Sequence, residues 1–342
     1  MPKSDLNLVD IPSVHVAYPA VDRDYPISPG ENLMRAFNHE KPMWMPIVPL
    51  AGNTTPRDGY GDVYIDPAAD GFDWFGIEYK YSETQKSSTP QGNVITEIVG
   101  WQEKINWPNL EEWDYSKGIE KFKRDDSLAT TGWYGYGLFE KLHSLEGFEQ
   151  ALVDLILETD ECRAFFERMA DHKARLFKGL NDVYNMDYIT YGDDWGTARA
   201  PFFSMDIFEK TLLEPTKRLV ASIQNEGMKV LFHNCGLIND FIPHLVEDIK
   251  ADCLMIQSIN DLEGIIKKYG DRVTIYTYLD LEIMYNPKYT EEDVRQYARS
   301  LVDKYGAHVN PGSGLMVMAY AKDAETFYAF EDELYNYSLE KY

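Results

Sequence analysis

Two residues of the sequence, His233 and Cys235, have the types and the spacing of a metal-binding pair. They stand two positions apart at the end of the predicted strand 229–232, and in an extended chain such side chains project to the same side. Imidazole and thiolate are ligands that zinc prefers, so one ion could be reached by both. A hydrogen-bonded histidine beside a buried thiol is the alternative. A zinc site also needs a third protein ligand, for which Asp193, Asp194 or a glutamate is the candidate.

Asp193 and Asp194 are a second candidate for chemistry, because they follow the predicted strand 188–191 closely. Adjacent side chains leave an extended chain in different directions. We therefore expect one functional acid, which hydrogen-bonds a substrate or orients His233, and one residue that caps the following helix. The alternative is that both carboxylates only cap the helix.

Short apolar segments that alternate with amphipathic helices must position these side chains. The predicted strands are 42–50, 128–134, 188–191, 229–232, 253–256, 273–276 and 315–319. The predicted helices are 148–157, 160–183, 204–226, 238–248, 260–268, 290–304 and 323–338. This α/β series is typical of a parallel sheet covered by helices, and the chain is long enough for a closed (β/α)8 TIM barrel. An open doubly wound sheet is the alternative, but no glycine-rich phosphate-binding motif follows an early strand.

The chain before residue 130 is less regular. A helix should begin after Ser28, which has the type of a capping residue and precedes a proline. Alternating residues predict a hairpin over 94–107. Residues 1–27 contain four prolines and little periodicity, so we expect an extended N-terminal leader. Residues 28–342 are then expected to form a single (β/α)8 catalytic domain.

The active site of such a barrel lies at the carboxyl ends of its strands, and polar residues follow most of the predicted strands. These residues are Asn53, Asp193, Asp194, His233, Cys235, Gln257 and Asp280. They should converge on one mouth if the barrel closes. Aromatic residues could line an apolar pocket there. The candidates are Trp44, Trp74, Phe75, Trp133, Tyr134, Tyr136 and Trp195.

The composition restricts the class of partner. The 342 residues include 57 acidic and 33 basic side chains, which gives a net charge of −24. A chain this acidic is repelled by phosphate backbones and anionic lipids, so we expect neither nucleic acid nor a membrane surface as its partner. No apolar run approaches the ~18 residues that span a bilayer. Three scattered cysteines indicate a reducing compartment, and we expect a cytoplasmic protein.

Several motifs, taken together and in order, resemble the uroporphyrinogen decarboxylase superfamily. They are Leu138 to Phe148, Tyr191 to Gly196, Glu214 to Leu219, Lys229 to Gly236, Gln257 and Asp280. The similarity covers most of residues 30–340. It implies the (β/α)8 barrel that the alternation of strands and helices also predicts.

Within this superfamily the residues favour the cobamide-dependent methyltransferases over the decarboxylases. The decarboxylases bind a porphyrinogen with many carboxylates and use arginines after the first strand, whereas residues 41–53 contain no arginine. The segments 71–76 and 100–110 resemble methyltransferases that demethylate aromatic methyl ethers of the veratrol or vanillate type. The alternatives are a decarboxylase, a methylcobamide:thiol methyltransferase and a non-catalytic binding paralogue.

The resemblance also implies cofactors and partners. The methyl group would pass to cobalamin on a separate corrinoid protein, since the chain has no Asp-x-His-x-x-Gly motif for corrinoid ligation. Zinc is implied as the metal, with His233 and Cys235 as ligands. Thiol methyltransferases carry a further cysteine where residues 311–314 read Pro-Gly-Ser-Gly, so the rest of the ligand shell does not carry over. Dimers are common among the decarboxylases, which makes a homodimer an expectation for this chain.

The same reasoning assigns roles to the strand-end residues. Asp193, His233 and Tyr191 are the candidate catalytic residues. The candidate substrate-binding residues are Asn53, Trp44, Asp194, Trp195, Gln257 and Asp280. In this hypothesis cob(I)alamin attacks the methyl carbon in line, and the protein stabilises the departing phenolate by protonation or through a metal.

Overall fold

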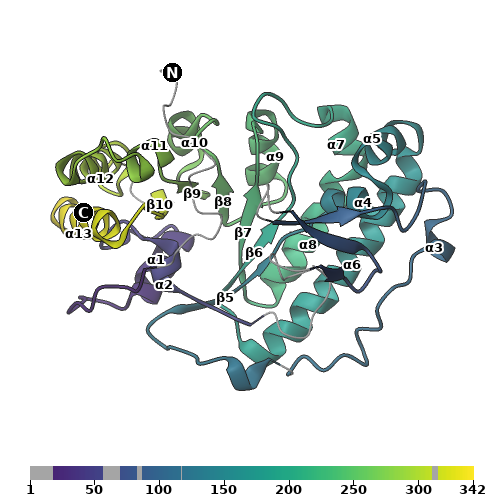
Figure 1. The fold of residues 1–342 in the computed structure, drawn as a ribbon, viewed down its shortest axis with the longest axis horizontal. Coiled ribbons are helices and arrows are strands. Elements are labelled where there is room, and N and C mark those ends of the chain that lie inside the picture. Colours follow the sequence, from purple (N-terminus) through teal and green to yellow (C-terminus); the bar gives the residue numbers. More distant parts are fainter. Residues whose placement is uncertain (1–17, 57–69, 83–86, 117, 310–314) are drawn as a thin grey trace. The chain divides into compact units, whose positions relative to one another are not determined.

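The structure, a computed structural model, describes residues 18–56, 70–82, 87–116, 118–309 and 315–342 (Figure 1). Its contacts divide the chain into two compact units. The first unit comprises Met1–Asn53, Asp125–Ala129 and Asp252–Tyr342, and the second comprises Thr54–Arg124 and Thr130–Ala251. No helix in the described part of the chain is both long and apolar enough to cross a bilayer.

The second unit is built around three parallel strands. They are β5 (Ala129–Tyr134), β6 (Tyr188–Gly192) and β7 (Lys229–Asn234). Thr131 pairs with Tyr188, and Tyr188 pairs with Lys229. Almost every residue of the three strands is buried, as expected of parallel strands that helices cover on their faces. The helices of this unit are α3 (Trp101–Lys104), α4 (Leu138–Glu146), α5 (Phe148–Leu157), α6 (Thr159–Tyr184), α7 (Met205–Thr211), α8 (Leu213–Asn225) and α9 (Ile242–Glu247).

The first unit has a parallel sheet of its own. Its strands are β8 (Cys253–Ile256), β9 (Thr274–Tyr278) and β10 (Leu315–Met318), and β9 pairs with both of the others. The helices of this unit are α1 (Pro29–Phe37), α2 (Val48–Ala51), α10 (Leu262–Tyr269), α11 (Leu281–Tyr285), α12 (Glu291–Tyr305) and α13 (Ala324–Lys341). The short strand β1 (Gly52–Thr54) includes Asn53 and Thr54, where the chain leaves the first unit and enters the second.

The predicted alternation of strands and helices is confirmed after residue 188. The five strands predicted there are present, and their ends shift by two residues at most. The predicted helix 204–226 is divided into α7 and α8. Pro215 stands in the first turn of α8 and has no N–H to donate to the carbonyl of Thr211, which contributes to the break.

The predicted hairpin over 94–107 is wrong. The N–H of Val94 donates to the carbonyl of Leu145 at 2.8 Å, and the N–H of Ile98 donates to the carboxylate of Asp154 at 2.8 Å. These bonds fasten the segment to α4 and α5 rather than to a partner strand. Antiparallel pairing occurs earlier in the chain instead, among β2 (Gly71–Phe72), β3 (Glu78–Ser82) and β4 (Ser87–Gln91).

The predicted strand 42–50 is also wrong in extent. It is reduced to one parallel bridge between Ile47 and Val317, supported by a hydrogen bond from the N–H of Val317 to the carbonyl of Pro46 at 3.0 Å. Pro46 and Pro49 have no N–H for a strand ladder. Pro49 is instead accommodated at the start of helix α2.

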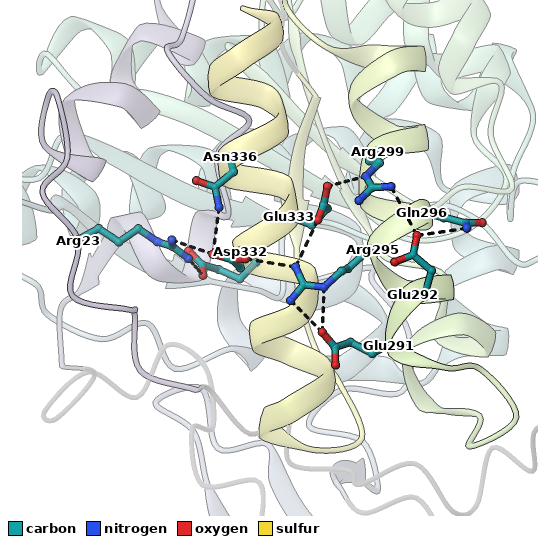
Figure 2. A network of polar contacts seen from close by, with 10 residues as sticks. Arg23, Glu291, Glu292, Arg295, Gln296, Arg299, Asp332, Glu333 and Asn336 are labelled. Atoms are coloured by element: carbon teal, nitrogen blue, oxygen red, sulfur yellow. Dashed lines mark hydrogen bonds and ion pairs between the residues drawn. The ribbon is translucent and has the colours of Figure 1, made fainter.

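The described part of the leader, residues 18–27, belongs to the first unit and packs against other residues of it. The ring of Tyr18 lies 5.0 Å from that of Phe327, and the ring of Tyr25 stacks at 5.3 Å on Trp44. The guanidinium of Arg23 forms ion pairs with Glu331 and Asp332. Figure 2 shows that this network continues from Asp332 on α13 to α12. Its further members are Glu291, Glu292, Arg295 and Arg299 on α12 and Glu333 on α13.

Candidate functional site

The structure brings His233, Cys235 and Asp194 together, and we call these residues the donor triad. The Nε2 atom of His233 lies 3.3 Å from Cys235 Sγ and 3.5 Å from Asp194 Oδ1. The N–H of Cys235 donates to Asp194 Oδ1 at 2.7 Å. One ligand atom from each residue lies within 4.8 Å of the others. The prediction that His233 and Cys235 face the same side is confirmed.

The neighbouring strands β6 and β7 set this geometry. In their parallel register Gly192 stands opposite His233, and a Cβ on Gly192 would lie 3.3 Å from His233 Cδ2. The side chain of Asn234 donates to the carbonyl of Asp193 at 2.6 Å and accepts from the N–H of Trp195 at 3.2 Å. These two bonds hold the backbone on either side of Asp194 and so orient its carboxylate toward the histidine.

Asp193 has a different environment from its neighbour. Its carboxylate accepts the N–H groups of Leu138, Phe139 and Glu140 at 3.0, 3.2 and 3.0 Å, and the residue has no exposed surface. It therefore caps the start of α4, and a Cβ on Gly137 would lie 2.2 Å from its own Cβ. Burial raises the pKa of Asp193 to about 6. We propose a structural role for Asp193 in place of the catalytic role that the sequence suggested.

Tyr191 and Trp195 lie in the core of the second unit. Both are fully buried. The ring of Tyr191 lies 5.3 Å from that of Phe232, and the indole of Trp195 lies 5.0 Å from Phe208 and 5.3 Å from Phe232. Because their side chains are not exposed, this burial argues against the predicted contacts of Tyr191 and Trp195 with a substrate. The structure indicates that both residues pack in the core next to the strands that carry the donor triad.

The remaining predicted substrate-binding residues all belong to the first unit. Trp44 is 6% exposed and stacks on Tyr25. Asn53 is half-buried in β1, and Gln257 is half-buried directly after β8. Asp280 is exposed and caps α11 through a hydrogen bond from the N–H of its second residue. Their roles in binding a substrate stay predictions.

Two more residues lie near the donor triad, of which the sequence predicted Glu140 in no role and Trp133 only as a candidate for lining an apolar pocket. Glu140, in the first turn of α4, has its pKa raised well above the usual range by burial and by the nearby carboxylates of Asp194 and Asp193. Trp133, on β5, is half-buried, and its ring lies 5.4 Å from that of His233. The sequence does not distinguish Trp133 from the other aromatic candidates, because it does not show which of them remain accessible.

Tyr136 marks the turn between β5 and α4. It is not glycine, yet its φ angle is +56°, a conformation that costs energy in most residues. Burial, Glu140, Asp73 and Asp194 raise the pKa of its phenol to about 12, so the phenol is neutral. The glycines on either side, Gly135 and Gly137, are the sequence signal that could have identified this turn.

The electrostatics of the donor triad suit a cation. Burial raises the pKa of the Cys235 thiol, and the charges of Asp194 and Glu140 raise it further. Burial lowers the pKa of His233, against the influence of Asp194, and so favours the neutral imidazole that binds metals. A divalent cation would offset the repulsion between the acidic groups and would favour the thiolate. The nitrogen, sulfur and oxygen donors therefore fit zinc.

The comparison with protein families decides the identity of the fold. The family model described as uroporphyrinogen decarboxylase (URO-D) matches residues 141–333. The chain belongs to the uroporphyrinogen decarboxylase family. The matched region of this URO-D chain contains β6, β7 and the whole donor triad. No curated protein sequence matches it.

A solved methyltransferase structure has the same fold. A methyltransferase from Methanosarcina mazei matches with a TM-score of 0.64 and 11% sequence identity, over 90% of this chain and 98% of that one. An endo-β-1,4-xylanase from Gloeophyllum trabeum matches with a TM-score of 0.42 and 10% identity, over 66% of this chain and 82% of that one. The URO-D family and the first of these likenesses show that the predicted α/β fold of the (β/α)8 type is correct. The glycine-rich segment 311–314, where thiol methyltransferases carry a cysteine, lies outside the described residues.

Proposed function

We propose that this chain is a corrinoid-dependent methyltransferase. It takes the methyl group from an aromatic methyl ether of the guaiacyl or veratryl type and passes it to cob(I)alamin on a separate corrinoid protein. The donor triad carries this proposal, because it places metal-binding side chains at the ends of β6 and β7 in a chain of the URO-D family. The likeness to a protein named a methyltransferase supports the reaction class.

The preference for an aromatic ether rests on sequence features. Residues 41–53 contain no arginine that could bind a polycarboxylate, and the segments 71–76 and 100–110 resemble aryl ether demethylases. The net charge of −24 also disfavours a polyanionic substrate. An uncharged aromatic ether needs no arginine for binding and is not repelled by the negative charge of the chain.

The donor triad would hold zinc through His233 Nε2, Cys235 Sγ and Asp194 Oδ1. Three protein ligands are the number found in catalytic zinc sites, which keep one position for a small molecule. A zinc ion bound here would stabilise negative charge on the ether oxygen as the methyl group leaves. The remaining steps depend on the chain itself.

The transfer breaks the bond between the methyl carbon and the ether oxygen. The electron pair of that bond stays on the oxygen, and the methyl carbon forms its new bond to cobalt with the electron pair of Co(I). Asn234 keeps the backbone around Asp194 fixed, so the carboxylate is oriented before the substrate arrives. The half-buried ring of Trp133 lies 5.4 Å from that of His233 and so borders the donor triad. The phenolate takes a proton after release, because the pKa of a phenol, about 10, lies above neutral pH.

The proposal is tested by mixing the purified chain with cob(I)alamin and a guaiacyl or veratryl ether under anaerobic conditions. Methylcobalamin and the demethylated phenol should form in equal amounts. His233→Ala should lower the turnover by about 100-fold or more. Ile119→Ser is the control, because Ile119 is 43% exposed and lies outside the donor triad and outside the segments 71–76 and 100–110. If no methylcobalamin absorbance appears with these ethers, the proposal is wrong for this substrate class.

The same preparation distinguishes the alternatives. Release of carbon dioxide from a porphyrinogen would identify a decarboxylase. Methyl transfer from methylcobalamin to a thiol, without demethylation of an ether, would identify a thiol methyltransferase. A binding paralogue would show neither reaction and would tolerate His233→Ala.

A further inference from the structure

Helix α5 exposes an unusual amount of apolar surface. Four of the nine large apolar side chains that the described residues expose lie on it, namely Phe148, Val153, Ile156 and Leu157. Ile156 and Leu157 are 67% and 71% exposed. Val153, Ile156 and Leu157 are spaced i, i+3 and i+4, so they share one side of the helix. We call these three residues the α5 face.

The helix itself is firmly held, so this exposure is not the fraying of a loose end. Ala151 and Leu155 are fully buried on the opposite side. The carboxylate of Asp154 accepts from the N–H of Ile98 at 2.8 Å and from the side chain of Gln150 at 2.8 Å. A helix that is apolar on its inner and its outer side normally has both sides covered. Exposed apolar patches of this kind mark sites of interaction.

The charges around the α5 face restrict what can cover it. From Gly147 to Cys162 the chain contains no lysine or arginine. The exposed or half-buried acidic residues in that stretch are Glu149, Glu158, Asp160 and Glu161. A second copy of the chain would bring an equally acidic border against this one, and an anionic membrane would be repelled. A partner with basic residues around its apolar surface would be attracted.

We propose that the α5 face docks an amphipathic helix of a partner protein, with an apolar stripe flanked by lysine or arginine. Residues spaced i, i+3 and i+4 form ridges that fit between the side chains of another helix. Figure 1 shows α5 at the periphery of the part of the chain that also contains α4 and α7. The proposal does not depend on the methyltransferase activity, since its evidence lies outside the donor triad.

The experiment uses the full-length chain and a fluorescent designed peptide of about 18 residues, helical, with leucines on one side and lysines beside them. Fluorescence anisotropy should show binding to the wild-type chain. The double variant Ile156→Ser/Leu157→Ser should weaken the affinity at least about tenfold, because it removes two apolar contacts. Phe72→Ser is the matched control, since Phe72 is also 67% exposed, and it should bind as the wild type does. Melting curves establish that the variants fold.

A second variant keeps the test decisive if the serine variant does not fold. Glu149→Gln retains the apolar residues and should weaken binding, with the larger effect at low salt. Equal binding of a scrambled peptide of the same composition would overturn the proposal, because it would show a charge effect alone. Self-association of the wild type that the serine variant abolishes would assign the face to a second copy instead. Binding of neutral phosphatidylcholine vesicles that depends on the face would assign it to lipid.

Discussion

Asp193 and Asp194 are adjacent carboxylates with opposite surroundings. Asp193 is buried and accepts three backbone amides of α4, whereas Asp194 Oδ1 faces His233 and Cys235. Chain geometry alone predicts that the two side chains separate. It does not predict which one is the cap, because the cap's partner Leu138 lies 55 residues earlier in the chain. The sequence therefore narrows the functional acid to Asp193 or Asp194. The position of α4 shows which of the two is the cap.

Asp194→Ala removes one of the three donors and should lower the affinity for zinc by more than the about 10- to 100-fold that the loss of a residue supporting a ligand costs. The loss is expected because two ligands hold zinc less firmly than three. The zinc content after dialysis against a buffered zinc solution measures this change. The melting temperature in the presence of a chelator should stay near that of the wild type, since Asp194 is half-buried. Full retention of zinc by this variant would exclude Asp194 as a ligand.

Asp193→Ala is the complementary variant, and it should affect stability. Three amides at the start of α4 lose a charged acceptor in a buried environment, which should lower the free energy of unfolding by about 2 kcal/mol. Chemical denaturation in the presence of a chelator gives this value. A variant as stable as the wild type would show that the cap contributes little, and Asp193 would become a candidate for catalysis again.

Among the elements, α4 connects the site with the antiparallel strands. Its first turn is capped by Asp193, and its Lys141 forms a 3.0 Å ion pair with Asp73, both side chains being fully buried. Asp73 also accepts the N–H groups of Phe75 and Ile77. The sequence did not predict α4 as a separate element, since it is short and lacks a capping side chain of its own. The resemblance to known proteins identified the segment, and the contacts show what it does.

Lys141→Met should destabilise the protein by about 3–5 kcal/mol, because it leaves the carboxylate of Asp73 buried without its cation. Replacing both residues, as Asp73→Asn/Lys141→Met, should recover part of this loss. Chemical denaturation measures the energies. Hydrogen exchange of β3 should become faster in the single variant, since the ion pair fastens this region to α4. Equal stability of the single variant and the wild type would contradict this role.

Glu146 on α4 and Asp154 on α5 make the stability depend on pH. Glu146 is fully buried, and its pKa is raised to about 8 by burial and by Asp154. In the unfolded chain a glutamate has a pKa of about 4.3. Between these values the folded protein holds a proton that the unfolded chain has released. The free energy of unfolding should therefore fall as the pH rises toward 8.

Glu146→Gln keeps a neutral side chain at every pH and should remove this contribution. The variant should resemble the wild type at pH 5 and should be more stable at pH 9, by on the order of 1–3 kcal/mol. Thermal melts at both pH values measure the difference. Asp182→Asn is a suitable control, because that residue is exposed. If wild type and variant lose stability equally between pH 5 and pH 9, Glu146 is not the cause.

For the whole molecule, the alternation of strands and helices was sufficient to predict an α/β fold of the (β/α)8 type. The family match and the likeness to a solved methyltransferase confirm it. The wrongly predicted strands lie before residue 130, and there the backbone bonds of 94–98 go to α4 and α5 instead of a neighbouring strand. Such long-range partners leave no periodic signal in the sequence. The roles of Asn53, Trp44, Gln257 and Asp280 in binding a substrate remain predictions.

The charge of the whole molecule leads to a prediction about salt. With a net charge of −24 the acidic groups repel one another more strongly in the folded chain than in the expanded unfolded chain. Between about 10 and 200 mM sodium chloride the Debye length falls from about 30 Å to below 10 Å. The melting temperature should rise over this range and then level off. Scanning calorimetry measures the dependence.

The shape of this curve separates screening from salt effects on hydration. Exclusion of salt from the protein surface strengthens apolar burial in proportion to concentration and continues at molar levels. Screening is nearly complete once the Debye length is shorter than the spacing of the surface charges.

The ion pairs of Arg23, Arg295 and Arg299 oppose the trend, because salt weakens them while it relieves the repulsion. Arg295→Gln removes two of the pairs that join α12 to α13, so this variant should melt at a lower temperature in low salt and gain more from added salt. A melting temperature that falls with salt in the wild type would mean that ion pairs, rather than the excess of acid, dominate its electrostatics.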